Sequence, residues 1–260
     1  MRAVLTIAGS DPSGGAGIQA DLKTFAALGV YGVSAVAALT AQSTVGVAAA
    51  AAVEADFVTA QIETAAGDIA LHAVKTGMLA NAAIVEAVAA AIREIDLPLV
   101  VVDPVFVSSS GERLLDDDGM SALRAELLPR ARVVTPNLPE AEALSGRTIR
   151  SAADARDAAR RIHALGPGAV IITGGHAAGG DVVDLLFDAG VFHEFRVPRV
   201  AVEDVHGTGC TFASAVAAHL ALGQPLATAA QEAQRYVAGA IAHAFAIGRG
   251  RRVLNHFWKE

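Results

Sequence analysis

Short apolar runs alternate along the chain with segments in which apolar residues recur at helical spacing. The apolar runs predict buried strands at residues 3–8, 33–39, 73–77, 97–102, 132–135 and 169–173. The periodic segments predict helices at residues 18–28, 56–69, 80–95, 117–128, 152–165 and 226–245, and a further helix after the loop 205–211. Two alternating runs, 182–187 and 191–197, predict a hairpin. Residues 46–53 leave two choices open: their alanines favour a helix, but their place after a strand end allows a short extended flap.

Strands that alternate with helices predict right-handed βαβ units and a mostly parallel sheet covered by helices on both faces. No repeat or low-complexity linker interrupts this alternation. The sequence therefore predicts a single α/β domain over residues 1–260, built as a three-layer sandwich.

Composition narrows the function classes. The formal net charge of −7 argues against a nucleic-acid surface, which needs clustered lysine and arginine. The one basic cluster, Arg249, Arg251 and Arg252, is either a solvated tail or a contact for a bound phosphate. Cys210 is the only cysteine, so an internal disulfide is excluded. No apolar run reaches the ~18 residues of a membrane helix. We expect a cytoplasmic protein that is not bound to a membrane.

The most informative stretch is Val205-His206-Gly207-Thr208-Gly209-Cys210-Thr211, which a run of small apolar residues follows at once. It predicts a tight loop that opens directly into a helix. The free N–H groups of a first helical turn bind anions. A thiol at that position is expected to have a lowered pKa. The alternative is an ordinary helix start with a small buried cysteine.

Polar residues also recur where successive predicted strands end. They are Asp11, Gln42, Asp103, Asn137 with Glu140, and His176. Ligands of open α/β sheets bind at the carboxyl ends of the strands. This series therefore predicts a site along one edge of the sheet.

Several motifs in this order resemble one family. They are Ile7-Ala8-Gly9-Ser10-Asp11 with residues 14–21, Thr40-Ala41-Gln42, Lys75-Thr76-Gly77-Met78, Asp103-Pro104-Val105, residues 135–142, Gly174-Gly175-His176, the loop 206–211, Gly248-Arg249-Gly250 and Asn255-His256-Phe257. The chain resembles the ribokinase-like small-molecule kinases and, within them, the hydroxymethylpyrimidine/phosphomethylpyrimidine kinases of thiamine biosynthesis.

The resemblance implies a homodimer with a small substrate flap, and two successive phosphoryl transfers from ATP with Mg²⁺. The acceptors would be 4-amino-5-hydroxymethyl-2-methylpyrimidine and then its monophosphate. By matching position, the residues of the pyrimidine site would be Gly9, Asp21, Gln42, Met78 and Val105, with Asp21 and Gln42 hydrogen-bonding the ring and Met78 and Val105 packing on it. Gly207, Thr208 and Gly209 would form the anion hole, and Cys210 would be the catalytic base. The nucleotide side would include Asp103, Asn137, Glu140, Thr173, Gly175 and His176, with Asp103 and Glu140 close to the metal.

Two departures from the family pattern concern the nucleotide side. Thr173 stands where the family often has lysine, and residues 106–111 differ from many relatives.

Three alternatives for the function also stay open. They are a pyridoxal-type vitamin kinase on the same fold, a cysteine hydrolase that uses Cys210 with His206, and a non-catalytic vitamin-binding regulator.

Overall fold

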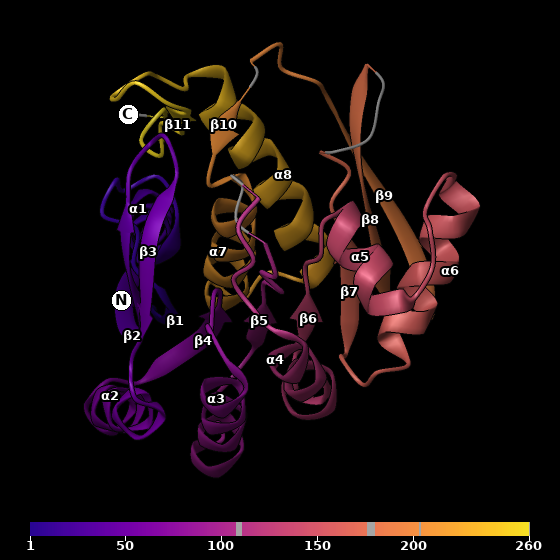
Figure 1. Ribbon diagram of the computed structural model, residues 1–260. Coiled ribbons are helices and arrows are strands. Elements are labelled where there is room, and N and C mark those ends of the chain that lie inside the picture. Colours follow the sequence, from indigo (N-terminus) through magenta and orange to yellow (C-terminus); the bar gives the residue numbers. More distant parts are fainter. Residues whose placement is uncertain (108–110, 176–179, 203, 260) are drawn as a thin grey trace.

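A nine-stranded sheet runs through the centre of the molecule in the order β3-β2-β1-β4-β5-β6-β7-β8-β9 (Figure 1). The computed structural model describes residues 1–107, 111–175, 180–202 and 204–259. Strands β2, β1, β4, β5, β6 and β7 are parallel, whereas β3 at one edge and β8 and β9 at the other pair antiparallel. The predicted mostly parallel α/β sandwich is confirmed.

The elements follow the predicted alternation closely. The strands are β1 (Ala3–Gly9), β2 (Tyr31–Gln42), β3 (Val47–Ala52), β4 (Leu71–Thr76), β5 (Val100–Val102), β6 (Val133–Val134), β7 (Ala169–Ile172), β8 (Asp181–Asp188), β9 (Val191–Pro198), β10 (Val205–His206) and β11 (Arg252–Val253). The helices are α1 (Gly17–Ala27), α2 (Ala55–Asp68), α3 (Ala82–Ile95), α4 (Asp117–Ala122), α5 (Leu138–Ser145), α6 (Ala152–His163), α7 (Thr208–Ala221) and α8 (Leu226–Ala242).

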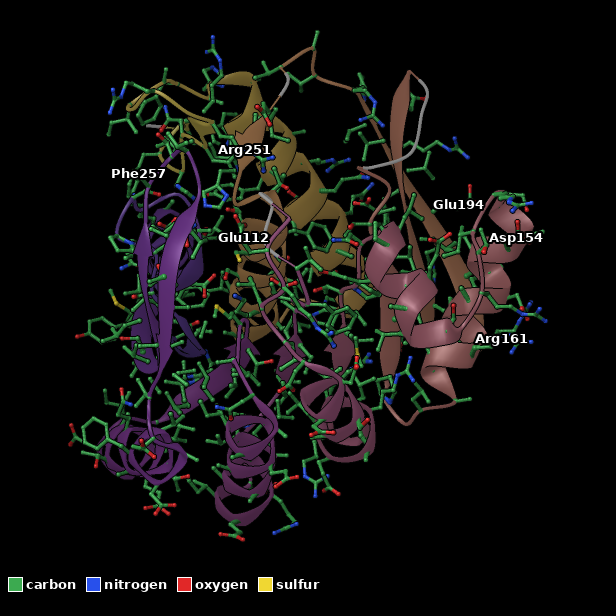
Figure 2. The ribbon with its side chains drawn as sticks, viewed as in Figure 1. Glu112, Asp154, Arg161, Glu194, Arg251 and Phe257 are labelled. Atoms are coloured by element: carbon green, nitrogen blue, oxygen red, sulfur yellow. The ribbon has the colours of Figure 1, made fainter. Side chains whose placement is uncertain are left out.

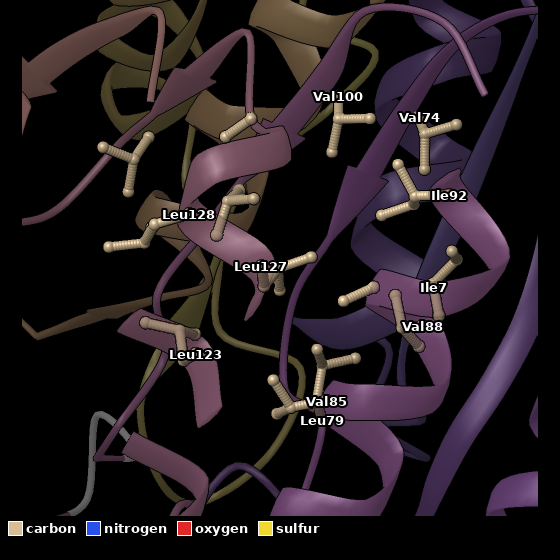
Figure 3. Packing of buried hydrophobic residues seen from close by; sticks show 14 of the residues in the cluster. Ile7, Val74, Leu79, Val85, Val88, Ile92, Val100, Leu123, Leu127 and Leu128 are labelled. Atoms are coloured by element: carbon tan, nitrogen blue, oxygen red, sulfur yellow. The ribbon is translucent and has the colours of Figure 1, made fainter. Parts of the chain in front are cut away.

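Two apolar cores hold the layers together, one on each face of the sheet. Alternate side chains of β1 supply both, since Leu5 and Ile7 belong to one core and Val4 to the other. The first core packs α2, α3, α5 and α6 on the sheet. Figure 3 shows the part of it in which α3 and residues 123–128 meet strands β1, β4 and β5. The second is formed with α1, α7 and α8. The sheet is thus covered on both faces, as its continuous apolar strands require.

Four segments differ from or refine the predictions. Residues 46–53 adopt the extended alternative, as β3 paired with β2. The predicted helix 117–128 is divided into α4, a π-helical turn (Leu123–Leu127) and a 3₁₀ turn (Leu128–Arg130). Helix α5 was not predicted, and the small parallel pair of β10 with β11 was not predicted either.

Among the described residues, no helix combines the length and apolar character that crossing a bilayer requires.

Candidate active site

The loop before α7 lies at the carboxyl edge of the sheet and has a backbone that only glycine permits. Gly207 has a φ of +87°, in the left-handed region. A Cβ atom on Gly207 would stand 1.9 Å from the carbonyl oxygen of Gly15 in the loop after β1. The two glycine-rich loops therefore lie against each other at one corner of the sheet, with no space for a side chain at Gly207.

The first turn of α7 is arranged to bind an anion. Thr211 is the first residue whose N–H closes an intrahelical bond, to the carbonyl of Gly207 at 3.0 Å. The N–H groups of Thr208, Gly209 and Cys210 therefore precede the intrahelical hydrogen bonds, and no side chain in the described part of the chain caps this end. His256 contacts Thr211, with 3.1 Å between its Nε2 and Thr211 Oγ1, which fixes this turn from behind.

The thiol of Cys210 is not the low-pKa group that its position at a helix start predicted. Burial raises its pKa to about 12, and the carboxylates of Asp103 and Asp21 act in the same direction. The charge of Lys75 and the N–H of Gly17 oppose this rise without overcoming it. The prediction of a thiolate was wrong because desolvation outweighs the helix terminus. At neutral pH the resting group is a thiol, which donates a hydrogen bond to Asp103.

Asp21 is not a solvated helix carboxylate, and its oxygens are already engaged by the protein. Lys75 Nζ lies 2.9 Å from Oδ2, which also accepts from Thr6 Oγ1 at 2.6 Å, while Ser214 Oγ donates to Oδ1 at 2.6 Å. Asp21 and Lys75 are both fully buried. Burial opposes the charge of Lys75, but Asp21 and Asp103 hold its pKa above the usual value. This arrangement argues against direct contact of Asp21 with the pyrimidine and assigns it to anchoring Lys75.

Asp103 and Glu140 are two buried carboxyls at the ends of β5 and β6. Burial raises the pKa of Asp103 to about 6, with Lys75 opposing and Asp21 adding to the rise. Burial also raises the pKa of Glu140 well above its usual range, and the charge of Asp103 adds to this. No described residue donates a hydrogen bond to Asp103 Oδ2, although the ammonium of Lys75 lies 3.9 Å from it. Two buried carboxyls with raised pKa values, one of them with an oxygen that accepts no hydrogen bond, fit a site that a cation completes.

Glu140 and Asn137 also have a structural role at the start of α5. The amide N–H of Asn137 donates to Glu140 Oε2, and the N–H of Glu140 donates to Asn137 Oδ1, both at 2.9 Å. This is a capping box. Within the described residues, no group of three or more His, Cys, Asp or Glu side chains could hold a metal by itself. A cation here would therefore need water or ligand oxygens to complete its shell.

The other residues predicted for the pyrimidine site lie at neighbouring strand ends. The N–H of Gly9 donates to the carbonyl of Met78 at 3.0 Å, and a Cβ on Gly9 would stand 3.1 Å from the Met78 sulfur. Met78, Val105 and Gln42 are all half-buried. Gln42 contacts His206 from the loop before α7.

Of the residues predicted for the nucleotide side, Thr173 and Gly175 lie beyond the end of β7. Thr173 forms a bridge with Asn137, and its N–H donates to the carbonyl of Pro136 at 2.9 Å. Gly175 is exposed, and its carbonyl accepts from Arg199. His176 and residues 108–110 lie outside the described residues.

The basic cluster near the C-terminus packs against the β2–β3 turn. The N–H of Arg251 donates to the carbonyl of Thr44 at 2.8 Å. Its side chain lies beside β10 (Figure 2) and pairs with Asp204 at 3.1 Å. This segment therefore fixes the turn of the β2–β3 hairpin, which is the predicted flap.

No role was predicted for Lys75, although it belongs to the motif Lys75-Thr76-Gly77-Met78. The signal was present, because a lysine interrupts the run 73–77, which was predicted to be a buried strand. The partnership of His206 with Asp11, whose Nε2 and Oδ2 lie 3.1 Å apart, was not predicted.

Comparison with known proteins agrees with this geometry. A family model described as phosphomethylpyrimidine kinase matches residues 11–255. A hydroxymethylpyrimidine/phosphomethylpyrimidine kinase of Streptomyces coelicolor is 48% identical over 98% of this chain and 94% of its own length. A thiamine biosynthesis bifunctional protein of Geobacter sulfurreducens is 50% identical over 97% of this chain, which spans only 52% of that longer relative.

Solved structures show the same fold. The pyridoxal kinase of Staphylococcus aureus in complex with ADP is similar at a TM-score of 0.92, with 36% identity over 100% of this chain and 94% of that one. A phosphomethylpyrimidine kinase of Clostridium difficile 630 has a TM-score of 0.81 and 39% identity over 91% of this chain and 98% of that one. On the sequence match, the chain belongs to the phosphomethylpyrimidine kinase family.

Proposed function

We propose that this protein transfers a phosphoryl group from ATP to the hydroxymethyl group of 4-amino-5-hydroxymethyl-2-methylpyrimidine, and then a second one to the monophosphate. The observation that carries the proposal is the first turn of α7. The N–H groups of this turn form no intrahelical hydrogen bonds and would bind the transferred phosphoryl group, beside the contact between Cys210 and Asp103. The names of the relatives identify the acceptors.

Nucleotide use is supported by neighbours that were solved with ADP and with AMP-PCP. Asp103, whose Oδ2 accepts no hydrogen bond from a described residue, and Glu140 would hold Mg²⁺ through one or two oxygens and water. The ion would supply neutralisation of triphosphate charge. These carboxyls have raised pKa values in its absence, which is consistent with a site that a cation completes.

Cys210 has a different importance in the two transfers. A primary alcohol must lose a proton to become a good nucleophile, whereas a phosphate oxygen is already anionic. The thiol is protonated at rest and directed to Asp103. We therefore assign Cys210 to a proton relay in the first transfer: its sulfur would take the proton of the alcohol while its own proton passes to the carboxylate of Asp103. Positioning by the first turn of α7 would serve both transfers.

We also propose a cytoplasmic homodimer. The exposed alanines of the edge strand β3, together with exposed Leu39 on β2, form an apolar sheet edge that a second copy would cover. Light scattering on the purified protein tests the dimer: a mass near 52.8 kDa, twice the 26.4 kDa of one chain, supports it and a single-chain mass contradicts it.

The test of the activity is incubation with ATP, Mg²⁺ and the hydroxymethylpyrimidine, followed by mass spectrometry. Successive mono- and diphosphate products are expected, and their absence with an active control kinase present would refute the proposal. Pyridoxal is the second candidate acceptor, because pyridoxal kinases are among the similar solved structures. Much faster turnover of pyridoxal than of the pyrimidine would reverse the choice.

A further inference from the structure

The buried pair of His206 and Asp11 lies directly behind Gln42. His206 Nε2 is 3.1 Å from Asp11 Oδ2 and 3.0 Å from Gln42 Nε2. Asp11 is almost fully buried and also accepts from the N–H groups of Gly15 and Ala16. Burial alone would raise the pKa of Asp11, but its bonds from His206, Ser13 and Ala16 hold that pKa below the ordinary value. Asp11 is therefore a carboxylate, which only accepts hydrogen bonds.

The charge of Asp11 determines which atom of His206 carries hydrogen. A carboxylate oxygen 3.1 Å from Nε2 requires an N–H at that nitrogen, in the neutral ring and in the protonated ring alike. A terminal atom of the Gln42 amide lies 3.0 Å from the same nitrogen, so this one N–H is shared between the carboxylate and the amide. An amide nitrogen of Gln42 facing it would place two donors against each other, so the amide oxygen must take this position.

The contact with Thr40 leads to the same orientation of the Gln42 amide. The Thr40 hydroxyl donates to the carbonyl of Ser10 at 2.8 Å, so its hydrogen is used. Its oxygen lies 3.3 Å from the second terminal atom of Gln42 and can only accept there. That atom must be the amide nitrogen. Turning the amide by 180° satisfies His206 and Thr40 together without moving the chain.

We infer that His206, held by Asp11, is a positioning residue that locks the Gln42 amide with its N–H towards the heterocycle. Gln42 Nε2 then uses one hydrogen for Thr40 and has the other for a ligand. The substrate recognised is a heterocycle whose edge presents a ring-nitrogen acceptor. The inference rests on the proposed function, because it takes Gln42 as a contact of the substrate ring.

The discriminating probe is a substrate whose ring edge has the opposite polarity. The deaminated analogue, 5-hydroxymethyl-2-methylpyrimidin-4(3H)-one, carries an N–H where the aminopyrimidine has its ring acceptor. A locked Gln42 would face that N–H with its own, and one such mispaired donor in a partly buried site costs roughly tenfold to a hundredfold in kcat/KM. The measurement is kcat/KM for the aminopyrimidine divided by kcat/KM for the analogue, and a high ratio indicates that the Gln42 amide is locked.

His206→Leu removes the N–H and frees the amide to turn. The ratio of kcat/KM is expected to fall roughly tenfold, through a lower KM for the analogue with little change in its kcat. His206→Gln restores a donor near the position of Nε2 and is expected to keep the wild-type ratio. Thr40→Val, at a half-buried position, removes the other half of the lock together with the hydrogen bond to the Ser10 carbonyl, and should also lower the ratio.

The outcomes separate the inference from the proposed function. If the wild-type protein phosphorylates the aminopyrimidine but the His206→Leu and Thr40→Val variants keep its substrate ratio, the lock is refuted and the kinase assignment stands. An equal loss of kcat/KM for the aminopyrimidine and for the analogue would also refute the lock, since damage to the fold lowers the activity on both substrates alike. A wild-type protein inactive on the aminopyrimidine would overturn the inference and the proposed function together.

Discussion

Replacing Lys75 by methionine tests the buried ion pair behind the active site. The substitution keeps the length of the side chain but leaves the fully buried carboxylate of Asp21 without its cation, 2.9 Å away. Asp103, at 3.9 Å from the same ammonium, loses it as well. Removal of one partner of a buried pair costs about 3–5 kcal/mol, because the remaining charge is desolvated and uncompensated.

The length of the chain determines how far this loss of free energy lowers the midpoint of thermal unfolding. For a chain of this length, each kcal/mol lowers the midpoint of thermal unfolding by about 2 °C. Lys75→Met should therefore lower the midpoint by about 6–10 °C, measured by calorimetry or circular dichroism near neutral pH. Thr6 and Ser214 still donate to Asp21 in this variant, which favours the lower part of that range.

The matched control is an ion pair that remains in solvent. Arg235 and Glu232 lie 2.7 Å apart on α8, with side chains 57% and 33% exposed. Arg235→Met should change stability by less than about 1 kcal/mol. Combining Lys75→Met with Asp21→Asn removes the orphaned charge and should recover part of the loss. Equal midpoints for the Lys75 and Arg235 variants would refute the reasoning.

Three further predictions concern the active site and the sheet behind it. Cys210→Ala should slow phosphorylation of the alcohol more than that of the monophosphate, measured as separate kcat values; equal losses would contradict the assigned role. Gly207→Ala should lower the free energy of unfolding by at least about 3 kcal/mol, because the clash with Gly15 adds to the strain of the left-handed backbone. Gly209→Ala, where a Cβ meets nothing within 4 Å, should not lower it. Equal midpoints of thermal unfolding for the two variants would disprove the backbone argument. Burial raises the pKa of Asp184 to about 6, so its stabilisation is complete below pH 4 and is lost as pH rises through 6. Asp184→Asn should therefore be more stable at pH 8 by up to about 3 kcal/mol, an advantage that vanishes towards pH 4 in urea titrations, and an advantage independent of pH would count against it.

The local pattern of apolar and polar residues was enough to predict most of the fold. Apolar runs and helical spacing located the central strands and most helices, because burial on both sheet faces leaves a strong signal in composition. The prolines at 136 and 139 hid α5, although Asn137 followed by Glu140 three residues later is a capping-box signature. The predicted strand 97–102 was too long, since Leu99 has a positive φ of 44° and pairing begins at Val100.

The chemistry of the candidate site was harder to predict, because it depends on residues far apart in sequence. Asp21 and Lys75 are 54 positions apart, and only the fold shows that each is the other's partner. The raised pKa of Cys210 likewise comes from desolvation and from Asp103 and Asp21, which a local rule for helix starts does not include. Sequence motifs thus located the corner but did not give its charge state.

That charge state gives the site a preference for what it binds. Lys75 is fixed by Asp21, so one buried cation serves a corner that also contains Asp103 and Glu140. The pKa values of both remaining carboxyls are raised, which means that their ionised forms are destabilised until a positive charge arrives. A triphosphate alone would add negative charge to this edge, where the described attractions for it are the α7 terminus and a Lys75 cation that Asp21 and Asp103 already share. A nucleotide that arrives with a divalent cation satisfies both ends at once, and this physical asymmetry favours a metal–nucleotide complex over the free nucleotide.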